Sequence, residues 1–207
     1  MTEPIASHAD GDPGAYETLV LGIGNVLWAD EGFGIRAVEA LHARYTFPDA
    51  VRLMDGGTQG IFLLPWVRSA KRLLIFDAVD FALEPATLKL VRGDDVPCYM
   101  GAKKVSMHQA GFQEVLSSAA LTGELPGEIA LVGVQPETLN DYGGSLTPGV
   151  RGRIGEAVDV ACAVLREWGV EPILRDEPLA GADLIGPGAL DMRDYELGRP
   201  AIGGKSQ

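Results

Sequence analysis

The sequence has few cysteines and little positive charge, and both shortages exclude classes of function. Only 2 of its 207 residues are cysteine, Cys98 and Cys162, and they lie far apart in the chain. This spacing argues against a disulfide framework and against a zinc site built on thiolates. The chain has 17 Lys and Arg against 29 Asp and Glu, a formal net charge of −12. Nucleic acids and anionic membranes repel such a surface, so neither is an expected partner.

Long apolar segments and targeting signals are also missing. Apolar runs such as IFLL at residues 61–64 are far shorter than the roughly 20 residues that cross a bilayer. The first residues, MTEPIASHADGDPGAY, are acidic and polar, without the basic and apolar regions of a secretory signal. We therefore expect a cytoplasmic protein that does not associate with membranes.

A serine or cysteine nucleophile finds little support. The sequence contains no Gly-x-Ser-x-Gly segment, the turn that exposes the nucleophile of many hydrolases. Cys98 has no basic neighbours beyond Lys103 and Lys104, and Cys162 falls inside the last predicted helix. Filling of the core is therefore a better interpretation of the cysteines than catalysis.

The glycine-rich stretch LGIGNVLWADEGFG, residues 21–34, begins like a dinucleotide-binding loop. Gly22 and Gly24 have the spacing of that fingerprint, but a leucine occupies the position of its third glycine. The acidic pair Asp30-Glu31 follows, and its charge would repel a pyrophosphate. These residues argue against a nucleotide-dependent oxidoreductase, an alternative that cofactor titration would test.

Predicted strands and helices alternate along the chain. Apolar runs predict strands at 17–24, 51–54, 72–76, 86–92 and 128–134, and helical spacing or capping signals predict helices at 33–45, 60–69, 107–120 and 147–169. Such alternation predicts an α/β fold, a three-layer sandwich with a twisted, mostly parallel central sheet. The strand at 86–92 follows the preceding strand too closely for a helical crossover, so we predict that it runs antiparallel.

The chain divides into three parts by composition. Residues 1–16 are predicted to be a loose N-terminal leader, 17–170 a single α/β domain, and 171–207 a tail rich in Pro and Gly. We expect the part of the tail from Asp176 to Gln207 to be weakly ordered or draped on the surface.

Acidic residues follow several of the predicted strands. Ligands bind at the carboxyl ends of the strands in open α/β sheets, where Asp30, Glu31, Asp55 and Asp77 are expected, and His108 begins a helix at the same edge. Neighbouring carboxylates repel one another unless a cation or protons neutralise them. Oxygen ligands with one imidazole suit a divalent ion such as Ni, Zn or Mn. The sequence therefore predicts a metal site with open coordination positions.

Each of these residues also has a simple structural interpretation. These are a helix cap for Asp30, a helix-start acid for Glu31, a turn carboxylate for Asp77, a surface histidine for His108 and a helix cap for Thr58 after a tight turn. His42 is expected on the exposed face of the first helix. Only convergence of the acids and His108 on one edge favours a site over these interpretations.

Five segments, in order along the chain, resemble the maturation endopeptidases of [NiFe]-hydrogenases, more closely those serving uptake-type, group 1 enzymes. They are LGIGNVLWADEGFGIRAVEAL, LMDGGTQG, IFDAVD, KVSMHQ, and LVGVQPETL with LTPGV. The resemblance spans about residues 17–170. It implies an α/β sandwich and a peptidase that removes the C-terminal extension of the hydrogenase large-subunit precursor after nickel insertion.

The resemblance also implies roles for individual residues. The metal contacts fall on Glu31, Asp77 and His108. Recognition of the precursor falls on Asp55, Gly56, Gly57 and Thr58. Asp55 or another carboxylate of the same edge is in addition a candidate general base.

The expected partner is the nickel-loaded precursor, and the expected oligomeric state is a monomer. We expect the nickel to arrive with the precursor rather than to stay bound to the protease. The alternative is a nickel-sensing chaperone of hydrogenase assembly without peptidase activity. Release of a C-terminal peptide from the precursor discriminates between the two.

Overall fold

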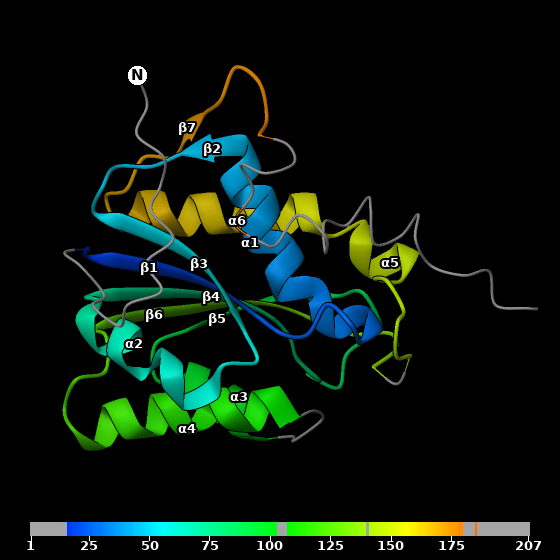
Figure 1. Ribbon diagram of the computed structural model, residues 1–207, viewed down its shortest axis with the longest axis horizontal. Helices are drawn as coiled ribbons and strands as arrows, with labels where there is room; N and C mark the ends of the chain where they lie inside the picture. Colours follow the sequence, from blue (N-terminus) through cyan, green and yellow to red (C-terminus); the bar gives the residue numbers. More distant parts are fainter. Residues whose placement is uncertain (1–15, 103–106, 140, 180–184, 186–207) are drawn as a thin grey trace, which may run out of the picture.

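The structure, a computed structural model, describes residues 16–102, 107–139, 141–179 and 185. A five-stranded sheet in the order β3-β1-β4-β6-β5 forms its centre (Figure 1). The strands are β1 (Thr18–Ile23), β3 (Val51–Gly57), β4 (Arg72–Ala78), β5 (Leu88–Arg92) and β6 (Glu128–Val134). Four of them run parallel and β5 runs antiparallel to β6, which confirms the predicted sheet and its antiparallel strand.

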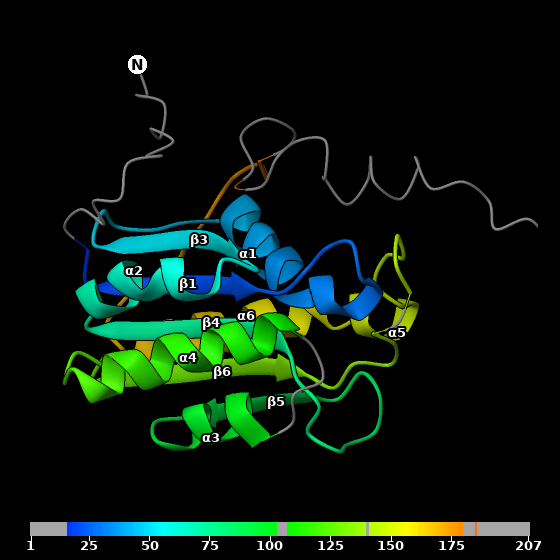
Figure 2. The same ribbon diagram turned by 60° about the horizontal axis from the view of Figure 1, so that its bottom comes forward.

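Helices cover both faces of this sheet (Figure 1 and Figure 2). On one face lie α1 (Phe33–Arg44) and α6 (Ile154–Glu167), which the short α5 (Pro148–Arg151) precedes. On the other face lie η2 (Gly60–Leu63), α2 (Leu64–Ser69), α3 (Asp95–Ala102) and α4 (Met107–Leu121). The predicted three-layer sandwich is therefore confirmed.

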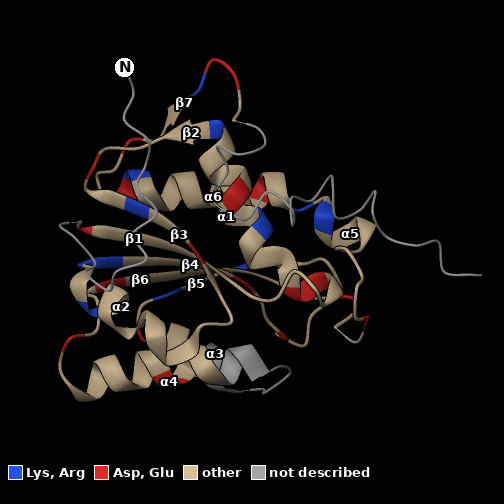
Figure 3. Cartoon of the chain, viewed as in Figure 1, with Lys and Arg blue, Asp and Glu red and all other residues tan. Residues whose placement is uncertain are grey.

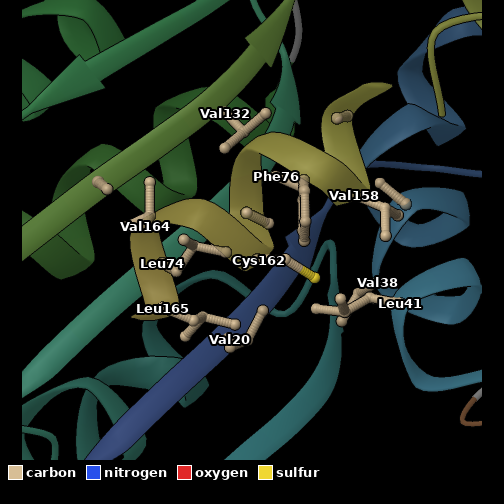
Figure 4. Packing of buried hydrophobic residues seen from close by; sticks show 14 of the residues in the cluster. Val20, Val38, Leu41, Leu74, Phe76, Val132, Val158, Cys162, Val164 and Leu165 are labelled. Atoms are coloured by element: carbon tan, nitrogen blue, oxygen red, sulfur yellow. The ribbon is translucent and has the colours of Figure 1, made fainter. Parts of the chain in front are cut away.

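The alternation of side chains along each strand divides the apolar core into two clusters. Leu74 and Phe76 of β4 join the cluster under α1 and α6, whereas Leu73 and Ile75 join the cluster under α2, α3 and α4. Figure 4 shows the first cluster, where Leu74 and Phe76 meet the side chains of α6. The same alternation directs Asp77, two residues after Ile75, to the face that α4 covers.

The sequence pattern does not predict four of the elements. These are the 3-10 turn η1 (Ala29–Gly32), the strands β2 (Tyr45–Thr46) and β7 (Ile173–Leu174), and α3. Each is too short to show a periodic pattern of apolar residues. The helices predicted over 60–69 and 147–169 are present but divided, the first into η2 and α2 and the second into α5 and α6.

The segment after residue 170 lies against the end of α1. β7 pairs antiparallel with β2, and the N–H groups of Arg175 and Leu179 donate to the carbonyls of Arg44 and Ala43. This segment half-buries His42, so the prediction of an exposed His42 is wrong. The division of the chain at residue 170 stays a prediction, and residues 1–15 of the predicted leader lie outside the described residues. No described helix combines the length and apolar character needed to cross a membrane.

Gly34 in the first turn of α1 brings this helix into direct contact with the sheet. A Cβ built there would collide with the carbonyl oxygens of Ile23 in β1 and Phe76 in β4. Gly22 of β1 acts similarly, since a Cβ there would collide with the carbonyl of Gly34. The glycines of residues 21–34 therefore permit close packing of strand and helix.

Gly34→Ala is expected to lower the free energy of unfolding by about 3 kcal/mol, because both colliding groups are backbone atoms that cannot rotate away. Gly155→Ala is the matched control: a Cβ at Gly155 of α6 meets no atom within 4 Å. That variant should be as stable as the unchanged chain or up to about 1 kcal/mol more stable. Urea unfolding measures both, and equal stabilities of the two variants would contradict the packing role of Gly34.

Candidate functional site

Glu31 lies in η1, the 3-10 turn between β1 and α1, and only 8% of it is exposed. Figure 3 shows the acidic residues of this turn in red, directly before α1. The carbonyl of Glu31 accepts a hydrogen bond from the N–H of Asn25 at 3.1 Å. Gly24 has φ 142° and no room for a Cβ beside that carbonyl. Glycine is thus required for η1 to pack on the loop that follows β1.

Asp30 is fully buried and binds a distant loop rather than capping α1. Its carboxylate accepts hydrogen bonds from the N–H groups of Glu137 (2.9 Å), Thr138 (3.0 Å) and Thr147 (2.7 Å), and from the hydroxyl of Thr147 at 3.2 Å. The N-cap of α1 is Gly32, without a side-chain bond. The predicted cap is therefore wrong, because three backbone donors of another segment take the carboxylate instead.

The segments that Asp30 holds, residues 135–139 and 141–147, fold over η1. The N–H of Ala29 donates to the carbonyl of Gly144 at 3.0 Å. Trp28 forms isolated bridges to Tyr142 and Gly144, and its ring stands edge-on to that of Tyr142 with centroids 5.2 Å apart. These contacts fix the position of the backbone that carries Glu31.

Asp77 is the penultimate residue of β4 and is fully buried. Its Oδ1 accepts a hydrogen bond from the N–H of Ala78 at 2.8 Å. It pairs with Gly133 of β6 at the carboxyl edge of the parallel strands, and η1 contacts β4 at this edge. The structure thus brings the segments that carry Glu31 and Asp77 together.

His108 is the second residue of α4, and its side chain lies outside the described part of the chain. The position of this helix is nevertheless defined one turn later. Gly111 lies against Gly60 of η2, so closely that a Cβ on Gly111 would be 3.4 Å from the Cα of Gly60. This contact sets the first turns of α4 on the face of the sheet to which Asp77 points.

Asp55 belongs to β3 but points to the opposite face. Asp55 of β3 and Phe76 of β4 both pair with Gly22 of β1 and so lie in one row across the sheet. The side chains of Asp55 and Phe76 therefore point to the same face, the one that α1 covers. Thr58 is exposed and caps no helix, since η2 begins after Gln59 without a side-chain cap; that alternative is wrong. Gly56 and Gly57, the remaining recognition residues, end β3.

The environment of Asp55 disfavours its charged form. Burial raises the pKa of this carboxyl, while the N–H of Gly57 and the guanidinium of Arg36 act in the opposite direction. Arg36 is itself buried on α1 and pairs with Glu39 at 2.9 Å. A carboxylate kept in such a place at a cost in stability is typical of a functional group.

Among residues 16–99, 111–139, 141–179 and 185, no group of three or more His, Cys, Asp or Glu is placed to hold a metal ion. His108 is outside that set, so convergence of Glu31, Asp77 and His108 stays a prediction.

Gln135 has a role in the site that the sequence did not predict. Its side-chain oxygen accepts hydrogen bonds from the N–H groups of Phe81 (2.8 Å) and Leu83 (3.2 Å), and its amide donates to Asp80 at 3.2 Å. It thereby holds the loop that follows β4 and Asp77. A glutamine directly after a buried strand is the only sequence signal of this role.

Asp30→Asn is expected to destabilise the protein by about 3 kcal/mol. The amide has one acceptor oxygen instead of two, and its NH2 group would face backbone donors. Asp159→Asn on the exposed side of α6 is the control and should stay within about 0.5 kcal/mol of the unchanged chain. Urea unfolding at pH 7 compares the two, and an Asp30→Asn variant as stable as this control would refute the anchoring role.

Asp55→Asn is expected to gain stability relative to the unchanged chain as the pH rises. The pKa of Asp55 is raised above its ordinary value of 3.8, so above that pH ionisation of this carboxyl destabilises the folded protein. Well below that pH the carboxyl is neutral in both the folded and the unfolded protein and has no such effect. Unfolding of the two proteins is compared at pH 3 and pH 7. A stability difference that moves against the variant between these pH values would contradict the assignment.

Comparison with known proteins finds relatives over most of the chain. The family model HycI, described as hydrogenase maturation protease, matches residues 35–164. The hydrogenase expression/formation protein HupD of Bradyrhizobium diazoefficiens is 55% identical over 183 residues, which cover 88% of this chain and 95% of HupD. The hydrogenase 2 maturation protease of Escherichia coli is 45% identical over 159 residues, 76% of this chain and 96% of that protein.

A solved structure with the same fold comes from a protein of the same kind. The hydrogenase maturating endopeptidase HybD from E. coli superposes with a TM-score of 0.73 at 44% identity, over 77% of this chain and 98% of HybD. A strong sequence match over most of the chain and a shared fold lead to one conclusion. The chain belongs to the hydrogenase maturation protease family and is an endopeptidase.

Proposed function

We propose that this endopeptidase removes the C-terminal extension of a [NiFe]-hydrogenase large-subunit precursor after nickel has been inserted. One observation carries the proposal: two buried carboxylates, Glu31 and Asp77, lie on segments that contact each other at the edge where α4 begins. Burial of carboxylates is costly unless a cation or hydrogen bonds compensate. The names of the relatives support a hydrogenase as the substrate.

Glu31, Asp77 and His108 are the residues that we propose to contact the nickel of the precursor. Two carboxylates and an imidazole suit this ion. Because Asp30 and Gln135 fix the loops on either side, the site is held before the substrate arrives. Nickel carried by the substrate therefore aligns the scissile peptide with the protease, and its charge polarises the carbonyl or a water molecule.

Water is the nucleophile that we propose for the cleavage. Cys162 is buried in α6 on the far face of the sheet, and burial raises the pKa of its thiol. Cys98 is exposed on α3, with its Sγ 3.6 Å from the carbonyl of Asp94. In hydrolysis the water oxygen adds to the scissile carbonyl, the C–N bond breaks, and the departing amine takes the proton that the water gives up.

Recognition of the precursor is the better role for Asp55. The pleat directs Asp55 and Asp77 to opposite faces of the sheet, which separates Asp55 from a water beside Asp77. The exposed residues Ile61 and Phe62 continue this segment into η2, so it has an apolar surface for a peptide. We therefore propose that residues 55–58 bind the precursor, and that the protease acts as a monomer in the cytoplasm.

A nickel-sensing chaperone would use the same three contacts without cutting the chain. The membership of an endopeptidase family favours cleavage. The mass of the precursor separates the two functions, because only the protease releases a C-terminal peptide.

Glu31→Gln, Asp77→Asn and His108→Gln are each expected to leave a folded protein that cuts nickel-loaded precursor at least 100-fold more slowly, about 3 kcal/mol in activation free energy. Each change removes a nickel ligand and nearly preserves the shape of the side chain. Mass spectrometry of the precursor follows the released peptide, with Asp159→Asn as a control that keeps full activity. Nickel-free precursor should remain uncut by every variant.

Full processing by all three variants would end the proposal. The same assay separates the roles of Asp55: a recognition defect in Asp55→Asn weakens precursor binding, whereas loss of a general base spares binding and lowers only the rate of cleavage.

A further inference from the structure

Lys89 lies in the same row of the sheet as Asp77. Asp77 of β4 pairs with Gly133 of β6, and Gly133 pairs with Lys89 of β5. Leu131 of β6 and Val91 of β5 each lie two positions from this row, and both belong to the cluster under α2, α3 and α4. Side chains two positions apart on a strand share a face, so those of Asp77 and Lys89 point to this same face of the sheet. Two strand spacings separate their Cα atoms, about 10 Å.

The ring of Phe81 covers Gly133 in the middle of this row. A Cβ at Gly133 would collide with this ring. Phe81 stands edge-on to Tyr99 of α3, with ring centroids 5.4 Å apart and an interplanar angle of 67°. Aromatic carbon replaces water there. The field of the Lys89 ammonium therefore reaches Asp77 through a medium of lower permittivity than water.

Aromatic rings hold the ammonium of Lys89. Its Nζ lies 4.2 Å from the ring centroid of Tyr99 and 5.2 Å from that of Phe81, and it donates to the Tyr99 hydroxyl at 2.7 Å. Across the described segments, no carboxylate lies within ion-pair distance of this ammonium. Its positive charge is therefore held in place without local neutralisation, beside the acidic edge.

We propose that Lys89 is a specificity-determining residue that keeps the affinity of the Glu31, Asp77 and His108 site for free divalent cations low. The inference rests on the proposed function, because it takes those three residues as nickel contacts. The fixed ammonium reduces repulsion between the carboxylates while no metal is present. It also repels an isolated dication. Nickel inside the precursor is held by the precursor as well, so the protease selects the loaded precursor over free metal.

Calorimetric titration of the full chain with Ni²⁺ alone, at low ionic strength, tests this role. Lys89→Gln is expected to bind Ni²⁺ about 10-fold more tightly than the unchanged chain, because one positive charge near the site is gone. The gain should shrink at high salt, since screening shortens the reach of the ammonium. Lys89→Arg keeps the charge and should bind Ni²⁺ as the unchanged chain does.

Lys71→Gln is the matched control. It removes the same charge at the amino end of β4, where Lys71 pairs with Glu17, and should leave the affinity unchanged. Nickel binding by Lys89→Gln that is equal, weaker or too weak to measure would overturn the proposal, as would an equal gain in Lys71→Gln.

Glu31→Gln distinguishes failure of this inference from failure of the proposed function. If Glu31→Gln binds Ni²⁺ as tightly as the unchanged chain, the proposed nickel contacts are wrong. If it loses binding while Lys89→Gln changes nothing, the nickel contacts stand and only the role of Lys89 is wrong.

Discussion

The buried carboxylate of Asp30 is the interaction on which the arrangement of the site depends. Its two oxygens accept four hydrogen bonds from Glu137, Thr138 and Thr147, and so join η1 to residues that come more than 100 positions later in the chain. Backbone N–H groups bound to a charged acceptor make stronger hydrogen bonds than neutral pairs do. Because Glu31 is the next residue, this network also fixes the backbone of the first proposed nickel contact.

Close backbone contacts at glycine complete the frame around Asp30. Gly34 sets α1 on β1 and β4, and Gly111 sets the start of α4 on η2. The two helices therefore meet the carboxyl edge of the sheet from opposite faces, one after Glu31 and the other with His108. Such a site needs little reorganisation when a substrate binds, which favours orientation of a single peptide bond.

The sheet, its strand directions and its layers could be predicted because they follow from local apolar patterns, as in Glu128–Val134, whose bounds are those predicted. Asp30 could not be interpreted in this way. Its partners lie 107 to 117 residues later, and an acid before a helix has a simpler local explanation as a cap. β7 could not be predicted either, because a strand of two residues shows no periodicity and its partner β2 is distant in the sequence. The side chains of Asp55 and Asp77 point to opposite faces of the sheet because of the register of the strands, and sequence patterns do not specify that register.

The central claim is that Glu31, Asp77 and His108 bind one nickel ion. Crystals of the protease soaked with Ni²⁺, measured at the nickel absorption edge, test it most directly through the anomalous difference map. The account predicts one strong peak about 2 Å from carboxylate oxygens of Glu31 and Asp77 and from an imidazole nitrogen of His108. A peak bound to other residues, with these three side chains too far apart to share an ion, would contradict it.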